Sequence, residues 1–271
     1  MATYSLTLAQ LALGYFDKTT ISPDGKITAG YNNSMGDLLH EFTLNYLDSE
    51  QELDRIGGKV LTRTNVTKTP DGQTGWAATM TGNGRLSMDY ILPETFTIVM
   101  TFKTSTVANL GLIFSTDQMK VWIDNTGKIN IWFKDSSDTT RTYVGSTSVQ
   151  YNNWNNLTVS LTPTVVRVIL NGTITIEQTG SWGLKQPSSA TLYFGYDGTN
   201  YFTGQFDRIK IYNRAFSVTD AVSERDKNCL PGDYPSECYY TTPWLKMQSN
   251  EYLVNYTVSS SVPTGKSLWG G

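Results

Sequence analysis

The sequence is poor in cysteine, histidine and charge, and each scarcity removes a class of protein from consideration. Two Cys and one His among 271 residues do not supply the roughly four ligands of a closed zinc site. Only 17% of the residues are charged, and the 21 Lys and Arg, against 24 Asp and Glu, form no basic run. We therefore expect no nucleic-acid partner.

Long apolar runs are also missing. No stretch approaches the roughly 20 apolar residues that span a bilayer, so no membrane span is predicted. The N-terminal residues 1–18 hold a short apolar run, but no Lys or Arg precedes it, and Thr and Gln interrupt it. A secretory signal peptide instead begins with positively charged residues, which an apolar run then follows. The sequence thus predicts a chain made in the cytosol and not exported by a conventional leader.

Helical periodicity is almost absent, whereas strand patterns recur. Seven Trp, 16 Tyr and 23 Gly, with stretches rich in Thr, Ser and Asn, are typical of many short strands joined by turns. One capping-box pattern, Ser217 to Asp220, predicts a helix of about two turns. The sequence therefore predicts an all-β protein, with its main strands at 95–103, 110–115, 119–124, 128–134, 141–146, 155–162, 164–172, 173–178 and 191–196.

Two of these strands, 119–124 and 128–134, form a hairpin whose register can be predicted. The Asn-Thr-Gly sequence at 125–127 is a good three-residue loop with Gly in the left-handed position, which pairs Asp124 with Lys128. Trp122 and Trp132 then lie diagonally on the polar face. The opposite, buried face takes the pairs Ile123 and Ile129, Val121 and Ile131, and Met119 and Phe133.

The apolar pattern of the segment 201–220 changes face midway. Phe202, Gly204 and Phe206 keep one phase of a two-residue period, and Ile209 and Ile211 keep the other. A strand changes face only where it holds an extra residue, so we predict a bulge or kink near Asp207–Arg208.

This segment also carries a family resemblance. Residues 201–217, YFTGQFDRIKIYNRAFS, closely resemble the closing signature of concanavalin A-like, laminin G-like domains, in which a strand precedes a short helix. Residues 152–172 are similar to the Trp-strand-turn-strand hairpin of that family, and residues 191–204 to the strand before the signature. The matching signature residues are Gly204, Phe206, Asp207, Ile209, Ile211, Tyr212, Asn213, Arg214, Ala215, Phe216 and Ser217.

The resemblance covers roughly 37–222 and implies a two-sheet antiparallel jelly-roll sandwich. Residues 1–36 would then be an N-terminal docking arm and 223–271 a C-terminal extension. By periodicity alone, the segment 36–58 reads either as a helix ending at Gly57-Gly58 or as a strand followed by a loop. The resemblance favours a strand at LLHEFTLN, 38–45.

The fold implied by this resemblance serves adhesion, sugar binding, hydrolysis and assembly, so function must be argued from particular residues. Hydrolytic members of the broader fold use carboxylates that alternate along one strand. The nearest pattern here, between Asp48 and Asp54, is in the wrong order and is expected in a solvated loop. The lone His40 has no Ser or Cys motif near it and is expected to be structural. We predict that the protein is not an enzyme.

Some laminin G-like domains bind calcium through a loop Asp, and this sequence has no dense acidic loop of the kind that calcium favours. We expect no cofactor, with calcium at Asp197 as a minor alternative. Cys229 and Cys238 bracket LPGDYPSE and are read either as a local disulfide or as two unpaired thiols.

Two clusters are candidates for binding a ligand or a partner, because sugar binding requires exposed aromatic faces beside amide and carboxylate groups. The first cluster is Trp122, Asn130 and Trp132, and the alternative is that a loop or a neighbouring subunit covers the two Trp. The second cluster is Tyr196, Asp197, Asn200 and Tyr201, in the loop before the signature, which can also be read as a polar turn.

The resemblance and the flanking segments together predict a non-enzymatic structural or adhesion protein of a virion, made in the host cytoplasm, such as a bacteriophage capsid decoration, head fibre or tail component. Its expected partners are other virion proteins or copies of itself, and a host-surface glycan. The alternative is a bacterial secreted or cell-surface carbohydrate-binding module, and a glycoside hydrolase is the minor alternative.

Overall fold

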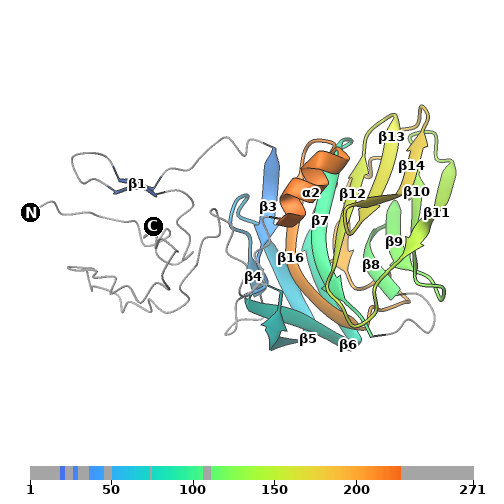
Figure 1. Ribbon diagram of the computed structural model, residues 1–271. Coiled ribbons are helices and arrows are strands. Elements are labelled where there is room, and N and C mark those ends of the chain that lie inside the picture. Colours follow the sequence, from blue (N-terminus) through green and yellow to red (C-terminus); the bar gives the residue numbers. More distant parts are fainter. Residues whose placement is uncertain are drawn as a thin grey trace, which may run out of the picture. The chain divides into compact units, whose positions relative to one another are not determined.

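The computed structural model describes residues 19–21, 27–29, 37–45, 51–73, 75–105 and 111–226 (Figure 1). The chain divides into two compact units, residues 1–35 with 238–271 and residues 36–237. Of the first unit, only strands β1 (Thr19–Ile21) and β2 (Ile27–Ala29) are described, and they pair antiparallel. Cys229, Cys238 and most of both predicted flanks lie outside the described residues, so those predictions stay predictions.

The second unit is an antiparallel β-sandwich, which confirms the predicted fold class (Figure 1). One hydrogen-bonded path runs β11-β10-β9-β8-β15-β6-β16-β7-β12-β13-β14, with β5 beside β6 and β3 beside β16. We call β5, β6, β15, β8, β9, β10 and β11 the front sheet, and β3, β16, β7, β12, β13 and β14 the back sheet. The bounds are β3 Leu38–Phe42, β4 Gln51–Leu53, β5 Val60–Gly72, β6 Gly75–Asp89, β7 Phe96–Lys103, β8 Gly111–Thr116, β9 Met119–Ile123, β10 Lys128–Lys134, β11 Thr140–Ser148, β12 Asn155–Leu161, β13 Val165–Leu170, β14 Thr173–Thr179, β15 Thr191–Phe194, β16 Gly204–Tyr212 and α2 Val218–Asp226.

The core between the sheets is built from the inward faces of nearly all these strands. Alternation along each strand places every second residue inside, as in β9, where Met119, Val121 and Ile123 are buried and the residues between them are half-buried. Burying each large apolar side chain contributes about 1.5–3 kcal/mol before the entropy of ordering is subtracted. The largest fully buried side chains include Phe42, Phe96, Phe102, Phe114, Phe133, Phe194, Phe202 and Phe206.

The predicted hairpin is confirmed in its register. Ile123 pairs with Ile129, Val121 with Ile131 and Met119 with Phe133. Gly127 has a φ of +81°, the left-handed conformation that the loop requires. Trp122 and Trp132 therefore lie on the outer face of the front sheet.

The bulge in β16 is confirmed as well. Asp207 pairs with Thr101 and Ile209 with Met100, so Arg208 is the extra residue, and its φ of +25° marks the distortion. Because of this residue, Phe206, Ile209 and Ile211 are all fully buried in one core. The bulge also lies where β16 stops pairing with β6, at Phe206, so it bends the strand from one sheet towards the other.

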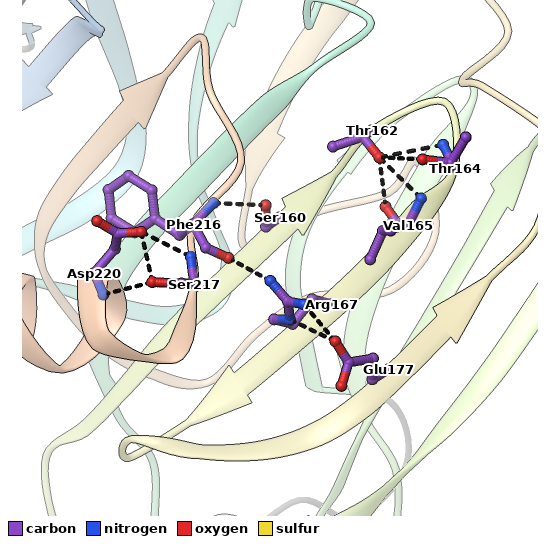
Figure 2. Close-up of polar contacts among 9 residues, drawn as sticks. All are labelled: Ser160, Thr162, Thr164, Val165, Arg167, Glu177, Phe216, Ser217 and Asp220. Atoms are coloured by element: carbon purple, nitrogen blue, oxygen red, sulfur yellow. Dashed lines mark hydrogen bonds and ion pairs between the residues drawn. The ribbon is translucent and has the colours of Figure 1, made fainter.

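The end of the family signature attaches helix α2 to the outer face of the back sheet (Figure 2). The Phe216 N–H donates to Ser160 Oγ at 3.1 Å, and Arg167 Nη1 donates to the Phe216 carbonyl at 2.8 Å. The same guanidinium pairs with Glu177 through Nε at 2.9 Å. At the start of the helix Ser217 Oγ accepts from the Asp220 N–H at 3.1 Å, which confirms the predicted cap. Under the helix lies a second, smaller core of Leu38, Val99, Ile169, Tyr212, Phe216 and Ala221.

The region before residue 76 differs most from the sequence prediction. The strand at 38–42 is confirmed as β3, and the helical alternative is wrong for the described part of 36–58. The acidic stretch expected in a solvated loop is instead partly strand β4, where Glu52 is fully buried, and Asp54 after it is buried too. Strand β5 was not predicted, because most of its exposed side chains are polar and two register shifts break its alternation.

Candidate functional site

Four residues with an aromatic side chain at each end form a row across the strands of the front sheet, and one of them, Ser115, is buried. Trp132 on β10 lies opposite Lys120 on β9, which lies opposite Ser115 on β8, which in turn lies opposite Tyr193 on β15. We call these four residues, Trp132, Lys120, Ser115 and Tyr193, the cross-strand row. Neighbouring strands are about 4.8 Å apart, so the two aromatic residues stand about 14 Å apart with Lys120 and Ser115 between them.

Trp122 widens the face at one end of the row. It lies opposite Asn130, and therefore diagonally from Trp132 on the same side of the hairpin. Both Trp side chains are half-buried, and so is Tyr193. Val144 on β11, opposite Asn130, is 59% exposed and adds apolar surface beside them. The first predicted cluster therefore lies on one face of the front sheet, with Asn130 buried and the two Trp half-buried.

The second predicted cluster lies in the loop between β15 and β16. Tyr196 and Tyr201 form an isolated bridge, and their rings stack with centroids 4.8 Å apart. Tyr193 meets Tyr196 edge to face at 5.3 Å, and the Arg85 guanidinium lies 5.1 Å from the Tyr196 ring centroid. The Tyr196 carbonyl accepts a hydrogen bond from Ser115 Oγ at 2.6 Å, which ties this loop to the row.

An ion pair joins the two clusters. Lys120 Nζ lies 2.9 Å from Asp197 Oδ2, and the side chain of Asp197 is only 5% exposed. Asp197 Oδ1 accepts from the backbone N–H groups of Thr199 and Asn200 at 3.0 and 2.8 Å. Burial raises the pKa of Asp197, but these N–H groups and the Lys120 ammonium outweigh it and hold the pKa below its usual value. The carboxylate is therefore ionised and anchors Lys120.

The two predicted amide residues are engaged within the protein. Asn130 is buried, and its Nδ2 donates to Asp124 Oδ2 at 2.9 Å and to the Lys128 carbonyl at 3.0 Å. Asn200 Nδ2 donates to both oxygens of Asp197 at 3.3 Å. Both amides hold loops in place, and the aromatic residues and Lys120 are what the face presents outward.

The suggestion of calcium at Asp197 remains untested. In the described structure a lysine ammonium already pairs with this carboxylate, so a cation would have to displace Lys120. Among the described residues, no group of three or more His, Cys, Asp or Glu is placed to hold a metal ion.

Two acidic groups that the sequence did not mark as buried, Glu52 and Asp54, line the edge of the sandwich between β3 and β5. Glu52 pairs with Lys68 and lies 3.6 Å from Arg63, while Asp54 Oδ2 lies 2.6 Å from His40 Nδ1. All these side chains are nearly or fully buried. Among the described residues, the hydrogen-bond partner found for His40 is Asp54, and the Tyr90 ring meets the imidazole edge to face at 4.7 Å. We name these five residues, His40, Glu52, Asp54, Arg63 and Lys68, the edge seam.

The chain belongs to the concanavalin A-like lectin/glucanases superfamily, because the model of its laminin G-like family matches residues 71–221. This match confirms the resemblance carried by the closing signature. No sequence among curated proteins matches the chain. No helix of the described residues is long and apolar enough to cross a bilayer.

Solved structures of the same fold include domain 4 of AbnA, a GH43 extracellular arabinanase from Geobacillus stearothermophilus, in complex with arabinotriose. It is 17% identical, with a TM-score of 0.55 over 69% of this chain and 97% of that one. The binding domains of Paraclostridial mosquitocidal protein 1 and botulinum neurotoxin serotype G are 15% and 14% identical, with TM-scores of 0.55 and 0.54. The matches cover 70% and 69% of this chain but only 52% and 50% of the toxin binding domains. At these identities the likeness shows the fold alone.

Proposed function

We propose that this protein is a non-enzymatic binding module that recognises a glycan through the outer face of its front sheet. The observation that carries the proposal is the Lys120–Asp197 ion pair, since it draws the Tyr196–Tyr201 loop to the strands that hold Trp122 and Trp132. Two clusters far apart in the sequence thus become one surface.

The chemistry of this surface suits a sugar. A pyranose or furanose ring has an apolar C–H side that packs on an aromatic ring, and hydroxyl groups at its rim that need donors and acceptors. Trp132 and Tyr193 supply the aromatic surface, and Lys120, 37% exposed at its side chain, supplies donors between them. The related arabinanase domain was solved with arabinotriose, which supports a carbohydrate ligand for this fold.

Binding without hydrolysis is favoured by where the acidic groups lie. A glycosidase needs two carboxyl groups that face the scissile bond from either side. On the proposed face Asp197 is held by Lys120 and by backbone N–H groups, and Asp124 accepts from Thr126 and Asn130. Glu52 and Asp54 lie in the edge seam, where Glu52 pairs with Lys68 and Asp54 is hydrogen-bonded to His40.

We further propose that the module is presented on a virus particle, as a structural or adhesion protein bound to other virion proteins or to copies of itself. The predicted flanks, 1–36 and 223–271, would serve as docking arms, apart from residues 223–226, which belong to helix α2. A secreted or cell-surface carbohydrate-binding module is the alternative. Mass spectrometry of purified particles tests the proposal, and recovery of the chain only from cell envelopes or culture medium would favour the alternative.

Glycan binding is tested on an array with the wild-type chain, Trp132→Ala and Trp154→Ala. Trp154 is a matched control because it is also half-buried but lies against Lys103 at the end of β7, away from the front-sheet row. We expect Trp132→Ala to lose binding while Trp154→Ala keeps it. If the wild-type chain bound none of the glycans on the array, the proposal would be overturned. If Trp132→Ala instead changed the mass measured by light scattering, the face would be a subunit contact.

A further inference from the structure

We infer that the side chains of Lys210 and Glu224 are joined by an isopeptide bond, which the folded chain forms by itself with Glu41 as the proton carrier. The bond ties helix α2 to strand β16 on the outer face of the back sheet. This covalent modification lies outside the front sheet, so it stands or falls independently of the proposed glycan binding.

The three residues come from three elements that meet beneath helix α2. Lys210 on β16 lies opposite Glu41 on the neighbouring strand β3, so their side chains share one face of the sheet. Glu224 is on α2, and its Oε1 accepts a hydrogen bond from Lys210 Nζ. Glu41 Oε1 lies 3.7 Å from the same Nζ. One amino group therefore faces two carboxyl groups.

The site beneath α2 is closed to water to an extent that charged side chains rarely tolerate. The side chains of Lys210 and Glu224 are each 7% exposed, and that of Glu41 is 5% exposed. Val99 lies opposite Lys210 on β7 and belongs to the smaller core under the helix. Two separate charges are costly in such surroundings, whereas the amide that replaces them is neutral. Burial therefore favours the condensed product.

Tyr212 holds the carboxyl group of Glu224 in place. Burial and the charge of Glu224, to which the phenol is hydrogen-bonded, raise the pKa of Tyr212. The phenol therefore stays protonated and donates to the carboxyl group. A donor on a carboxyl oxygen stabilises the negative charge that develops there when an amine attacks the carbon.

The atoms of the reaction balance with the loss of one water molecule. Glu41 carries two protons, one after the other, from the Lys210 nitrogen to one oxygen of Glu224. After the first transfer the neutral amine attacks Cδ of Glu224 and the C–N bond forms. After the second transfer the C–O bond breaks and the oxygen leaves as water. The nitrogen keeps its third hydrogen in the amide, Glu41 is regenerated as a carboxylate, and no oxidant or other reactant takes part.

The buried pair of Lys68 and Glu52 in the edge seam is arranged differently. The Arg63 guanidinium lies 3.6 Å from Glu52 Oε1, and a guanidinium keeps its charge in proteins. A carboxylate beside a permanent cation is a poor target for an amine, which attacks the neutral acid. Beneath α2 the nearby arginine, Arg208, lies 3.7 Å from Glu41, which carries protons and is not attacked.

Other ion-paired lysines of the described residues lie nearer the surface. The side chains of Lys103, Lys120, Lys134 and Lys185 are 25–37% exposed. Water solvates an ammonium group at such positions and keeps it protonated, so it does not act as a nucleophile. The burial of Lys210 between two carboxyl groups is what selects it.

The test is mass spectrometry of the intact, unfolded and reduced wild-type chain. We expect its mass to be lower than the mass of the sequence by one water molecule. Trypsin should then fail to cut after Lys210, because it requires a free lysine side chain. The digest should contain residues 209–214 joined to residues 215–225, and fragmentation of this branched peptide should place the bond between Lys210 and Glu224.

Three variants test the roles of the residues. Glu41→Gln keeps the size of the side chain but cannot carry a proton, so this variant should have the full mass of its sequence. Lys210→Arg keeps the positive charge without the nucleophile and should also have its full mass. Lys120→Arg is the matched control, because Lys120 is ion-paired with Asp197 on the front sheet, and this variant should still lack one water molecule.

The wild-type mass alone decides whether the bond exists, so a variant that fails to fold does not leave the inference open. If the wild-type mass equalled that of the sequence, the inference would be overturned and Lys210 and Glu224 would be an ion pair. A cross-link between other peptides, such as those of Lys68 and Glu52, would overturn the assigned site. Loss of water in a folded Glu41→Gln variant would overturn the role of Glu41.

Discussion

Lys120 Nζ on β9 and Asp197 Oδ2 in the β15–β16 loop lie 2.9 Å apart, although 77 positions separate them in the chain. Asp197 is almost fully buried and Lys120 is 37% exposed at its side chain, so the pair sits at the rim of the front face. If the lysine of such a pair were removed, the buried carboxylate would be left without its partner, and this costs free energy. The pair therefore sets both the position of the loop and the position of the ammonium.

Replacing Asp197 by Ala should release the loop. The change removes the acceptor of the Thr199 and Asn200 N–H groups as well as the partner of Lys120. We expect a loss of about 1–3 kcal/mol in the free energy of unfolding, measured by urea denaturation. Hydrogen exchange should show faster exchange at residues 199–202 and not in β9. Unchanged exchange in the loop would contradict the anchoring role of Asp197.

Replacing Phe206 by Ala should destabilise the whole sandwich. Phe206 is fully buried and stacks on Phe202 with ring centroids 4.5 Å apart, immediately before the bulge in β16. Removal of a large core side chain costs about 3–5 kcal/mol, measurable by denaturant or thermal unfolding. Val144→Ala is the matched control, because Val144 is 59% exposed and its truncation should cost less than about 0.5 kcal/mol. A loss below about 1 kcal/mol for Phe206→Ala would contradict the position of the bulge.

The edge seam should depend on its buried glutamate. Burial lowers the pKa of Lys68, and the charge of Glu52 partly offsets this effect. Glu52→Ala leaves the ammonium without its carboxylate and should cost about 3–5 kcal/mol in unfolding free energy. The double variant Glu52→Leu/Lys68→Met removes both charges and should recover most of that loss. If the single and the double variant were equally stable, the loss caused by Glu52→Ala would not come from leaving the Lys68 ammonium unpaired.

Asp54 should make stability depend on pH in the acidic range. Burial raises its pKa, but hydrogen bonds from His40 and from the N–H groups of Ile56, Glu41 and Lys59 outweigh this and lower it. A carboxyl whose folded-state pKa is depressed contributes stability that is complete above the unfolded value, about 3.9, and is lost as pH falls through the lower folded value. The stability difference between the wild type and Asp54→Asn, from urea unfolding at several pH values, should therefore shrink as the pH falls below about 4. A difference that grows on acidification would contradict this assignment.

Local patterns in the sequence predicted a good part of the fold. The hairpin at 119–134 followed from a turn of known geometry and a two-residue apolar period, and its register was right at every pair. The bulge at Arg208 followed from a change of phase, since a strand with one buried face cannot change phase without an extra residue. Where alternation is weak, the prediction failed, as in β5 and β4.

The candidate site was predicted only as two separate clusters. Trp122 and Trp132 were placed on the outer face by the hairpin register alone, and Tyr196 and Tyr201 were marked by composition. Nothing in the local sequence near Lys120 indicates Asp197 as its partner, and Tyr193 was not selected at all. The strand order that makes β15 a neighbour of β8 was the missing signal, since it creates the cross-strand row.

The sequence by itself determined which face of each regular strand is buried, where turns and the bulge fall, and the family to which the closing signature points. These features depend on the neighbours of a residue along the chain, through side-chain alternation and turn geometry. Only the tertiary structure decided that β8, β9, β10 and β15 lie side by side and that Asp197 meets Lys120. Contacts of this kind form across long loops, where many pairings are sterically open and the burial of the whole core selects one of them.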